Sequence, residues 1–404
     1  MRYNVIIIGA GQAGLSTAAA LRQKKYSGSI LLIGKEKFFP YQRPPLSKAF
    51  LLDSKFEKTL YLKSEDFYKK KDINILTNVS VSEIQPEKKA IVLDKNQVIS
   101  YEKLVISTGS KVNEMNFSNS TNHTHYLRTI DDAIKLRNTI KKSKEIVIIG
   151  AGYIGLEVAS AALKHDTKVS IIETSNRILG RSTSRIMANF LQKKHESLGI
   201  EFLLSTSVLD VIDVDNKKRV ICNRGFNIDT DGVLIAIGIK PEVALAKKAN
   251  IKCDNGIVVD ENGRTSDKNI FSVGDCTSHP SFIYNHNLRL ESVQNAIEQA
   301  KSVASSIIGE NEPYNQVPTF WSDQYNLKLK IAGIIDNYDS KFIFGDTKKE
   351  KFAVFFIKNQ RVIAVESINH QKAFLKGKKL IKGKCDVPKD ILRSGDESFA
   401  KWLL

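Results

Sequence analysis

Cysteine is scarce in this chain of 404 residues and is absent from its first half. The cysteines number four, lie far apart and form no C-x-x-C pair: Cys222, Cys253, Cys276 and Cys385. Such a pattern indicates a reducing compartment and no metal site. The sequence therefore predicts a protein whose function depends on neither a bound metal nor a closely spaced thiol pair.

Long hydrophobic runs are also missing. The segment 146–163 is nearly apolar but contains Glu157 and three glycines, so it predicts a buried strand followed by a helix and not a membrane span. The apolar run after Arg2 ends at Gly9, and a nucleotide-binding turn explains it better than a signal peptide does. We expect a cytoplasmic protein that does not bind membranes.

Acidic residues are too few to balance the basic ones. The chain has 61 Lys and Arg against 44 Asp and Glu, and the formal net charge is +17. This excess favours an acidic partner, although a lysine-rich sequence can also reflect the base composition of a genome. No nucleic-acid recognition motif accompanies the charge, so we expect no nucleic-acid partner. The length and the 42% hydrophobic content allow two or three domains.

A glycine-rich turn occurs twice, each time between a hydrophobic run and a predicted helix. The two copies are Gly9-Ala10-Gly11-Gln12-Ala13-Gly14 and Gly150-Ala151-Gly152-Tyr153-Ile154-Gly155. In such a turn the first glycine bends the chain, the second lets backbone N–H groups approach a pyrophosphate, and the third packs the helix against the strand. The helix N-terminus then faces the phosphates.

Each copy is followed by a second hydrophobic strand and an acid. The strand 29–33 precedes Glu36, and the strand 168–172 precedes Glu173. A carboxylate at this place accepts hydrogen bonds from ribose hydroxyls. Two complete units make a purely structural role for the turns a poor explanation, so the sequence predicts two dinucleotide sites.

The remaining patterns predict an α/β fold with two Rossmann-like domains and a C-terminal α+β domain. A proline-rich loop covers 38–48, and a strand at 103–107 ends in Ser107-Thr108-Gly109. A later strand, at 269–273, ends in Gly274-Asp275, which suggests that the chain returns to the first sheet. The predicted domains are residues 1–112 with 242–312, residues 113–241 beginning with a polar linker at 113–124, and residues 313–404.

Shorter elements complete this prediction. Hydrophobic spacing predicts a helix over 291–308. Further strands are expected in the first domain at 74–76, 79–84 and 90–93, in the second at 200–211, 219–222 and 232–237, and in the third at 328–332, 340–344, 352–357 and 362–367. A short lysine-rich helix follows the last strand.

At the level of motifs the sequence resembles the FAD-dependent, NADH-linked ferredoxin and rubredoxin reductases, a family of flavoproteins with two dinucleotide-binding domains. The resemblance covers essentially the whole chain. Its motifs are Arg43-Pro44-Pro45-Leu46-Ser47-Lys48, Ser107-Thr108-Gly109, Gly152-Tyr153-Ile154-Gly155-Leu156-Glu157, Val273-Gly274-Asp275-Cys276, the segment 289–296, and Phe320-Trp321-Ser322-Asp323-Gln324-Tyr325. The family places FAD on the first turn and NADH on the second.

The resemblance implies a set of FAD-binding residues, in which Asp275 binds the ribityl chain and the helix near Ser292 points its N-terminus at the flavin. That N-terminus would stabilise the negative charge of the reduced flavin. The set is Gly9, Gly11, Ala13, Gly14, Glu36, Arg43, Lys48, Val81, Thr108, Gly109, Asp275, Ser292, Val293 and Trp321. Lys35 stands where the family often has a second acid, which weakens the assignment of Glu36 to the ribose.

The residues implied for NADH lie in and after the second turn. They are Gly150, Gly152, Tyr153, Ile154, Gly155, Glu157, Glu173, Arg181 and Gly238. Glu173 would repel a 2′-phosphate and thereby favour NADH over NADPH, while the nearby Arg177 and Arg181 leave NADPH open.

Four residues are implied for the reaction itself. Lys48 and Glu157 would pair beside flavin N5, Tyr153 would cover the flavin until nicotinamide displaces it, and Trp321 would lie on the opposite flavin face, where electrons leave. Each has a plain structural alternative: a buried ion pair, a packing tyrosine and a core tryptophan.

The related disulfide reductases carry redox-active cysteine in the segment that here runs from Tyr41 to Lys48, and this chain has none there. The resemblance therefore implies delivery of electrons to an external carrier. An acidic [2Fe–2S] ferredoxin serving a P450 or Rieske-type oxygenase fits the positive charge. Rubredoxin reductase, NADH oxidase and a redox-sensing flavoprotein of the apoptosis-inducing-factor type are the competing hypotheses, and we expect a monomer or weak homodimer. The basic residues that could steer the carrier are Arg289, Lys328, Lys330, Lys376, Lys378, Lys379, Lys382 and Lys384.

Overall fold

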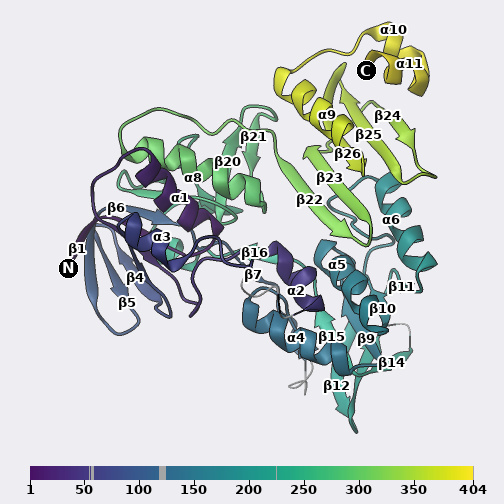
Figure 1. Cartoon of the computed structure of the whole chain (residues 1–404), viewed down its shortest axis with the longest axis horizontal. Helices are drawn as coiled ribbons and strands as arrows, with labels where there is room; N and C mark the ends of the chain where they lie inside the picture. The colour runs from purple at the N-terminus through teal and green to yellow at the C-terminus, as the bar shows by residue number, and fades with distance from the viewer. Residues whose placement is uncertain (54, 56–58, 118–123, 224, 404) are drawn as a thin grey trace. The chain divides into compact units, whose positions relative to one another are not determined.

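The computed structural model describes residues 1–53, 55, 59–117, 124–223 and 225–403 (Figure 1). Contacts divide the chain into two units, each made of three segments. The first unit contains Met1–Gln42, Thr59–Lys111 and Lys240–Thr319, and the second contains Arg43–Lys58, Val112–Ile239 and Phe320–Leu404. The three-domain boundaries given above stay a prediction, and residues 118–123 of the predicted linker lie outside the described residues.

The first unit is built on a sheet of seven strands, in which five pair in parallel and β5 and β4 are added to β6 by antiparallel pairing. The order is β3-β2-β1-β6-β5-β4, and β19 pairs with the second half of β6. The strands are β1 (Arg2–Ile8), β2 (Ile30–Ile33), β3 (Ile73–Leu76), β4 (Val81–Gln85), β5 (Ala90–Leu93), β6 (Val98–Ile106) and β19 (Ile270–Ser272). The prediction that the chain returns to the first sheet is confirmed.

Apolar residues cover both faces of this sheet, as a parallel sheet requires. Val5 to Ile8 of β1 and all of β2 are buried. On one face α1 (Gln12–Gln23) and α8 (Val293–Ile307) lie side by side (Figure 1), and small residues such as Ala18 and Ala304 fill their contact. Smaller elements complete the unit: α3 (Glu65–Lys70), α7 (Ala244–Lys248), β17 (Cys253–Asp254), β18 (Gly256–Val258), β20 (Thr277–Ser281) and β21 (His286–Leu288). The short strands β7 (Ser110–Val112) and β16 (Ile239–Pro241) each include residues of both units.

The second unit contains another parallel sheet, in the order β11-β10-β9-β15-β8. Its strands are β8 (Thr124–His125), β9 (Glu145–Ile149), β10 (Lys168–Ile172), β11 (Glu201–Leu203) and β15 (Gly232–Ile235). The helices α4 (Ile130–Lys142), α5 (Tyr153–Ala162) and α6 (Arg185–Ser197) belong to it, with a 3-10 turn η3 (Leu163–His165) after α5. The segment from the proline-rich loop contributes η1 (Pro44–Ser47) and α2 (Ala49–Leu52) to this unit.

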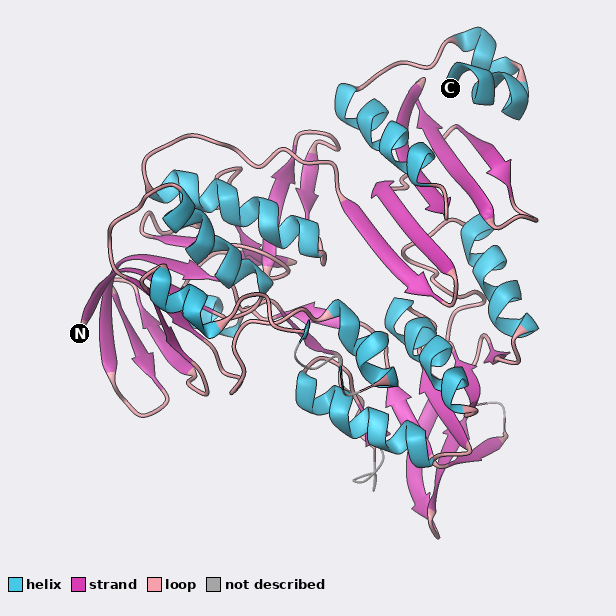
Figure 2. Cartoon of the chain, in the orientation of Figure 1, coloured by secondary structure: helices cyan, strands magenta, loops and turns pink. Residues whose placement is uncertain are grey.

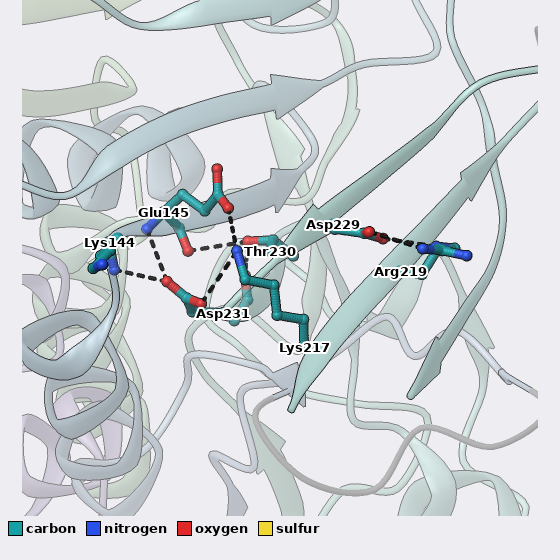
Figure 3. Close-up of polar contacts among 8 residues, drawn as sticks. Lys144, Glu145, Lys217, Arg219, Asp229, Thr230 and Asp231 are labelled. Atoms are coloured by element: carbon teal, nitrogen blue, oxygen red, sulfur yellow. Dashed lines mark hydrogen bonds and ion pairs between the residues drawn. The ribbon is translucent and has the colours of Figure 1, made fainter. Parts of the chain in front are cut away.

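A three-stranded antiparallel sheet is attached at the amino end of β9. It consists of β12 (Val208–Val214), β13 (Lys217–Cys222) and β14 (Asn227–Thr230). Figure 3 shows how Lys217 reaches Glu145, 2.7 Å away, and Asp231, whose carboxylate also accepts the backbone N–H of Lys144. This polar network lies at the edge of the parallel sheet opposite Gly150. The predicted strand over 200–211 is thus two strands, β11 and β12, because a turn at 204–207 separates them.

The chain ends in an antiparallel five-stranded sheet, in the order β22-β23-β26-β25-β24. Its elements are β22 (Thr319–Gln324), β23 (Leu327–Gly333), β24 (Ser340–Asp346), β25 (Lys351–Lys358), β26 (Arg361–Ile368), α9 (Gln371–Gly383), α10 (Lys389–Arg393) and α11 (Gly395–Leu403). Helix α9 packs on the sheet (Figure 2), and a Cβ added to Gly377 would lie 2.5 Å from Cγ1 of Val365. The predicted α+β character of this part is confirmed.

Candidate functional site

The first glycine-rich turn has the geometry that a close approach to phosphate requires. Gly9 has φ +112°, and a Cβ added there would lie 2.2 Å from the carbonyl oxygen of Ser107. A Cβ added to Gly14 would lie 2.0 Å from the carbonyl oxygen of Gly9, so both glycines are needed for packing. A Cβ added to Gly11 meets no atom within 4 Å. Packing therefore does not require the middle glycine, whose open side lies at the start of α1.

Three strands of the first sheet end beside this turn. Because β1, β6 and β19 are parallel neighbours, the turn, the Thr108-Gly109 pair and the Gly274-Asp275 pair meet at one sheet edge. Thr108 Oγ1 donates to the carbonyl of Glu242 at 2.6 Å, and a Cβ added to Gly274 would lie 2.9 Å from Cβ of Ala13. The structure thus brings together half of the residues predicted for FAD, namely those of the first turn with Thr108, Gly109 and Asp275.

The remaining residues of the first unit that were predicted for FAD lie near the ends of other elements. Glu36 follows β2 and accepts a hydrogen bond from the hydroxyl of Tyr41 at 2.6 Å. Val81 begins β4 and is half-buried. Ser292 caps α8, because its Oγ accepts the N–H of Asn295 at 3.2 Å, so the helix begins at Val293, two residues after the predicted start.

Arg43 and Lys48 fold with the second unit. Arg43 Nη1 donates to the carbonyl of Arg128 at 2.5 Å. Lys48 Nζ lies 2.7 Å from Oε2 of Glu157, and the ammonium also donates to the carbonyl of Pro44 at 3.3 Å. The predicted pairing of Lys48 with Glu157 is therefore present.

Glu157 is a buried carboxylate with donors from two other segments of the unit. It is 3% exposed. Besides Lys48, it accepts hydrogen bonds from Ser47 Oγ at 2.5 Å and from Ser322 Oγ at 2.6 Å. Sequence reasoning did not assign these two serines, although both stand inside the motifs that carried the family resemblance. Three donors around one carboxylate satisfy a charge that would otherwise be costly to bury.

The second glycine-rich turn repeats the geometry of the first. Gly150 has φ +105°, and its added Cβ would lie 2.6 Å from the carbonyl oxygen of Ala236. The Cβ of Gly155 would lie 2.3 Å from the carbonyl oxygen of Gly150. For Gly152 the nearest atom is 4.0 Å away. Again only the middle glycine has free space on its side.

The helices that follow both turns begin without a side-chain cap. Among the described helices of ten or more residues, α4, α6, α8 and α9 are each capped by a side chain, while α1 and α5 have none and have no acid in the first turn. Their unpaired N–H groups and positive ends fit the pyrophosphate of a dinucleotide. The residues present thus fit FAD at the first turn and a nicotinamide dinucleotide at the second.

Glu173 lies beside the second turn. Its Oε2 accepts the N–H of Ala151 at 2.9 Å, and its Oε1 accepts the N–H of Ser175 at 2.8 Å. A carboxylate can accept further bonds, so these contacts orient Glu173 without using its whole capacity. Gly238 has φ +98°, and its added Cβ would lie 3.4 Å from Nη2 of Arg181, so these two predicted residues also meet.

Tyr153 is the first residue of α5 and contacts the C-terminal sheet. Its ring lies 4.4 Å from the ring of Phe320, tilted by 36°, and its hydroxyl donates to the carbonyl of Ser182 at 3.5 Å. Burial raises the pKa of Tyr153, so its hydroxyl stays protonated. Trp321, next to Phe320 on β22, is half-buried, whereas Ile154 is 42% exposed. The contact with Phe320 was not predicted, because no local pattern pairs residues so far apart.

All four cysteines are free, and Cys222 and Cys276 are buried. Cys276, which follows Asp275, is fully buried, and burial raises its pKa, so the thiol stays protonated and unreactive. No group of His, Cys, Asp and Glu among the described residues could hold a metal ion. Within the same part of the chain, no helix is both long and apolar enough to span a bilayer.

The basic residues predicted to steer a carrier differ in their contacts. Arg289 is paired with Glu291 and donates to Asn255 at 3.0 Å, which ties part of its charge to the protein. Lys330 donates to Gln371 and lies 5.7 Å above the ring of Phe374. Lys328 and most of the lysines of α9 are exposed.

Comparison with known proteins gives matches along the whole chain. Residues 3–300 match the family described as pyridine nucleotide-disulphide oxidoreductase, and residues 319–402 match the one described as reductase C-terminal. Putidaredoxin reductase of Pseudomonas putida is 35% identical over 98% of this chain and 95% of that protein, and a rubredoxin-NAD(+) reductase of the same organism is 35% identical over 91% and 96%.

A solved structure agrees with these sequence matches. The covalent putidaredoxin reductase–putidaredoxin complex contains a chain that superposes with a TM-score of 0.94 at 34% identity, covering 99% of this chain and 98% of the other. The predicted fold class and family resemblance are thus confirmed. The chain belongs to the pyridine nucleotide-disulphide oxidoreductase family and is an FAD-dependent oxidoreductase that uses NAD(H).

Proposed function

We propose that the protein is an NADH-dependent reductase that passes electrons through FAD to an acidic [2Fe–2S] ferredoxin, which in turn serves a P450 or Rieske-type oxygenase. The observation that carries this proposal is the content of the segment 41–48. In place of a thiol it holds two prolines and Lys48, whose ammonium is paired with Glu157. Without a thiol relay, electrons that reach the flavin leave the protein directly.

FAD, when bound, accepts a hydride from NADH and releases electrons singly, which is the chemistry that the protein itself does not supply. We assign pyrophosphate binding to the two turns, in which N–H groups at the starts of α1 and α5 have no side-chain partner. We assign the reacting groups to Lys48 and Glu157, the aromatic gate to Tyr153 and the exit of electrons to Trp321. The other residues predicted for each cofactor keep their proposed roles.

NADH is favoured over NADPH in this proposal. Glu173 carries a negative charge at the second turn, and its carboxylate is already oriented by the N–H groups of Ala151 and Ser175. A 2′-phosphate brought to this place would meet like charge, whereas a 2′-hydroxyl can donate a hydrogen bond.

An acidic ferredoxin is favoured as the acceptor because the chain carries a net charge of +17, which accelerates a weak encounter with an acidic protein. A relative is named putidaredoxin reductase, and another is named rubredoxin-NAD(+) reductase, so rubredoxin is the second candidate acceptor. Direct reduction of oxygen and a redox-sensing role are weaker hypotheses, because neither of them involves an acidic partner that the positive charge would attract. We further propose a cytoplasmic protein that acts as a monomer or weak homodimer.

The decisive experiment follows cytochrome c reduction by NADH with the purified holoenzyme. We expect a negligible rate until a [2Fe–2S] ferredoxin is added. A comparable rate with rubredoxin alone would favour rubredoxin reductase, and NADH oxidation at the same rate without any carrier would identify an oxidase. An NADH-dependent dimer with slow turnover would instead favour the redox-sensing role.

A further inference from the structure

Glu366 is a buried carboxylate in the middle of β26 whose hydrogen bonds leave its own sheet. It is 0% exposed, and its partners in the neighbouring strands are Ile331 and Val354, both apolar. Its Oε1 accepts the backbone N–H of Ser184 at 3.0 Å, and its Oε2 accepts the hydroxyl of the same serine at 2.5 Å. Both oxygens of one buried acid are thus used on a single residue of the dinucleotide-binding part.

Ser184 is the last residue of the segment 174–184, which connects β10 to α6. The same hydroxyl that contacts Glu366 accepts the N–H of Met187 at 3.2 Å and so caps α6. Glu366 therefore fixes the far end of the connecting segment and the start of the helix together.

Internal contacts make this segment one structural piece. Arg177 donates to the carbonyls of Gly180 at 2.6 Å and Thr183 at 3.0 Å. The N–H of Leu179 donates to the carbonyl of Ala151, inside the second glycine-rich turn, at 3.0 Å. A displacement of Ser184 would therefore be transmitted to the second glycine-rich turn through the hydrogen bonds of Arg177 and Leu179.

The segment also carries Arg181, which is predicted for the dinucleotide, and contacts two other residues predicted for it, Gly238 and Tyr153. Arg181 lies against Gly238, and the carbonyl of Ser182 accepts the hydroxyl of Tyr153. Since Arg181 and Ser182 lie within three positions of Ser184, their placement depends on the hydrogen bonds that Glu366 accepts from Ser184.

We propose that Glu366 is a positioning residue for NADH: by holding Ser184, the C-terminal domain sets the conformation of the segment 174–184 on which the dinucleotide binds. This inference rests on the proposed binding of NADH at the second turn. Nothing in the resemblance assigned a role to Glu366, and the acid does not need to touch the cofactor to act in this way.

The electrostatic surroundings give the anchor a second property. Burial raises the pKa of Glu366 to about 7, while the hydrogen bonds from Ser184 and the charge of Arg177 act in the opposite direction. The pKa of Tyr153 is raised by burial first and also by the charge of Glu366. The ionised carboxylate accepts two charge-assisted hydrogen bonds, so the anchor is stronger above neutral pH than below it.

The test uses the holoenzyme with Glu366→Ala, Glu366→Gln and Ser367→Ala. Ser367 is the matched control, because it is the next buried polar residue of the same strand and donates to the carbonyl of Lys330 within the C-terminal sheet. Because Glu366→Ala removes both hydrogen bonds to Ser184, we expect it to raise KM for NADH about tenfold or more, with kcat and FAD content within about twofold. Ser367→Ala should leave KM unchanged.

The pH profile separates positioning from simple packing. KM of the unaltered protein should fall as the pH rises from 6 to 8, whereas Glu366→Gln, which keeps the shape but not the charge, should give a flat profile. An unchanged KM in Glu366→Ala, or an equal rise in Ser367→Ala, would overturn the inference.

A readout without NADH keeps this inference distinct from the proposed function. Arg181 is exposed. Trypsin cleavage after Arg181, followed by mass spectrometry, should be about tenfold faster in Glu366→Ala and unchanged in Ser367→Ala. Unaltered cleavage would contradict the anchoring role even if NADH binds as proposed. Failure of NADH to reduce the flavin of the unaltered protein, with faster cleavage in the variant, would instead refute the proposed function.

Discussion

Replacement of Glu157 by glutamine should destabilise the second unit strongly, although the side chain keeps its size. The carboxylate is 3% exposed and accepts bonds from Lys48, Ser47 and Ser322. Glutamine leaves the Lys48 ammonium without its counter-charge. It also replaces one accepting oxygen by an NH2 group, which donates hydrogen bonds and cannot accept one. Breaking a buried ion pair costs about 3–5 kcal/mol, and since the Lys48 side chain is 20% exposed we expect about 3 kcal/mol.

The assay is urea unfolding followed by tryptophan emission. Both tryptophans of the chain, Trp321 and Trp402, belong to the second unit, so the signal reports that unit. The variants are Glu157→Gln, Lys48→Met and the two combined. Each single change leaves an unpaired partner, and the combined change does not. The loss of unfolding free energy in the combined variant should therefore be smaller than the sum of the two single losses, by at least about 1 kcal/mol. Additive losses, or a loss below about 1 kcal/mol in Glu157→Gln, would refute the assignment of a coupled buried pair.

Three other changes test separate parts of the site. Gly11→Ala should fold but lose FAD, which would be seen as a lower ratio of flavin to protein absorbance. Gly14→Ala should fail to fold, because its Cβ would overlap the Gly9 carbonyl. Retention of FAD by Gly11→Ala would contradict the proposed pyrophosphate contact. Glu173→Ala should lower the preference for NADH over NADPH, as the ratio of kcat/KM values measures, and an unchanged ratio would remove Glu173 from the recognition of ribose. Burial lowers the pKa of His195 to about 4. Between about pH 6.5 and pH 4 the imidazole is therefore protonated in the unfolded chain but neutral in the folded protein. Stability should therefore fall by about 3 kcal/mol as the pH drops from 6.5 to 4, and His195→Gln should flatten this part of the profile in urea unfolding; an unchanged slope would contradict the buried neutral imidazole.

Local patterns were enough to predict the two glycine-rich turns between strand and helix. The closest contacts at Gly14 and Gly155 come from Gly9 and Gly150 of the same strand–turn–helix unit, so glycine spacing and hydrophobic runs identify these turns. The contacts that crowd Gly9 and Gly150 come from Ser107 and Ala236, which no local pattern places there. The pairing of Lys48 with Glu157 came from resemblance, and its geometry is confirmed at 2.7 Å. Their cofactor roles stay predictions.

Contacts between distant segments could not be predicted in this way. Ser322 and Glu157 are 165 positions apart, and Glu366 and Ser184 are 182 apart. Hydrophobic periodicity marks Glu366 only as an acid in a buried strand, which a single sequence cannot pair with any donor. The short hairpin of β20 and β21 was missed because Thr277–Ser281 contains a proline and few apolar residues, and its strand conformation depends on pairing with β18.

The path of the chain has a consequence for the order in which the protein can be made. The polypeptide passes from one unit to the other at residues 42–43, 58–59, 111–112, 239–240 and 319–320. Strand β19, an edge of the first sheet, is synthesised after the whole parallel sheet of the second unit. During translation the second half of β6 therefore stays unpaired on one side until residues 270–272 emerge, and that exposed edge is a site where a nascent chain is vulnerable to misassembly. No single cut in the chain releases either unit whole, so truncation is a poor route to an isolated cofactor-binding domain.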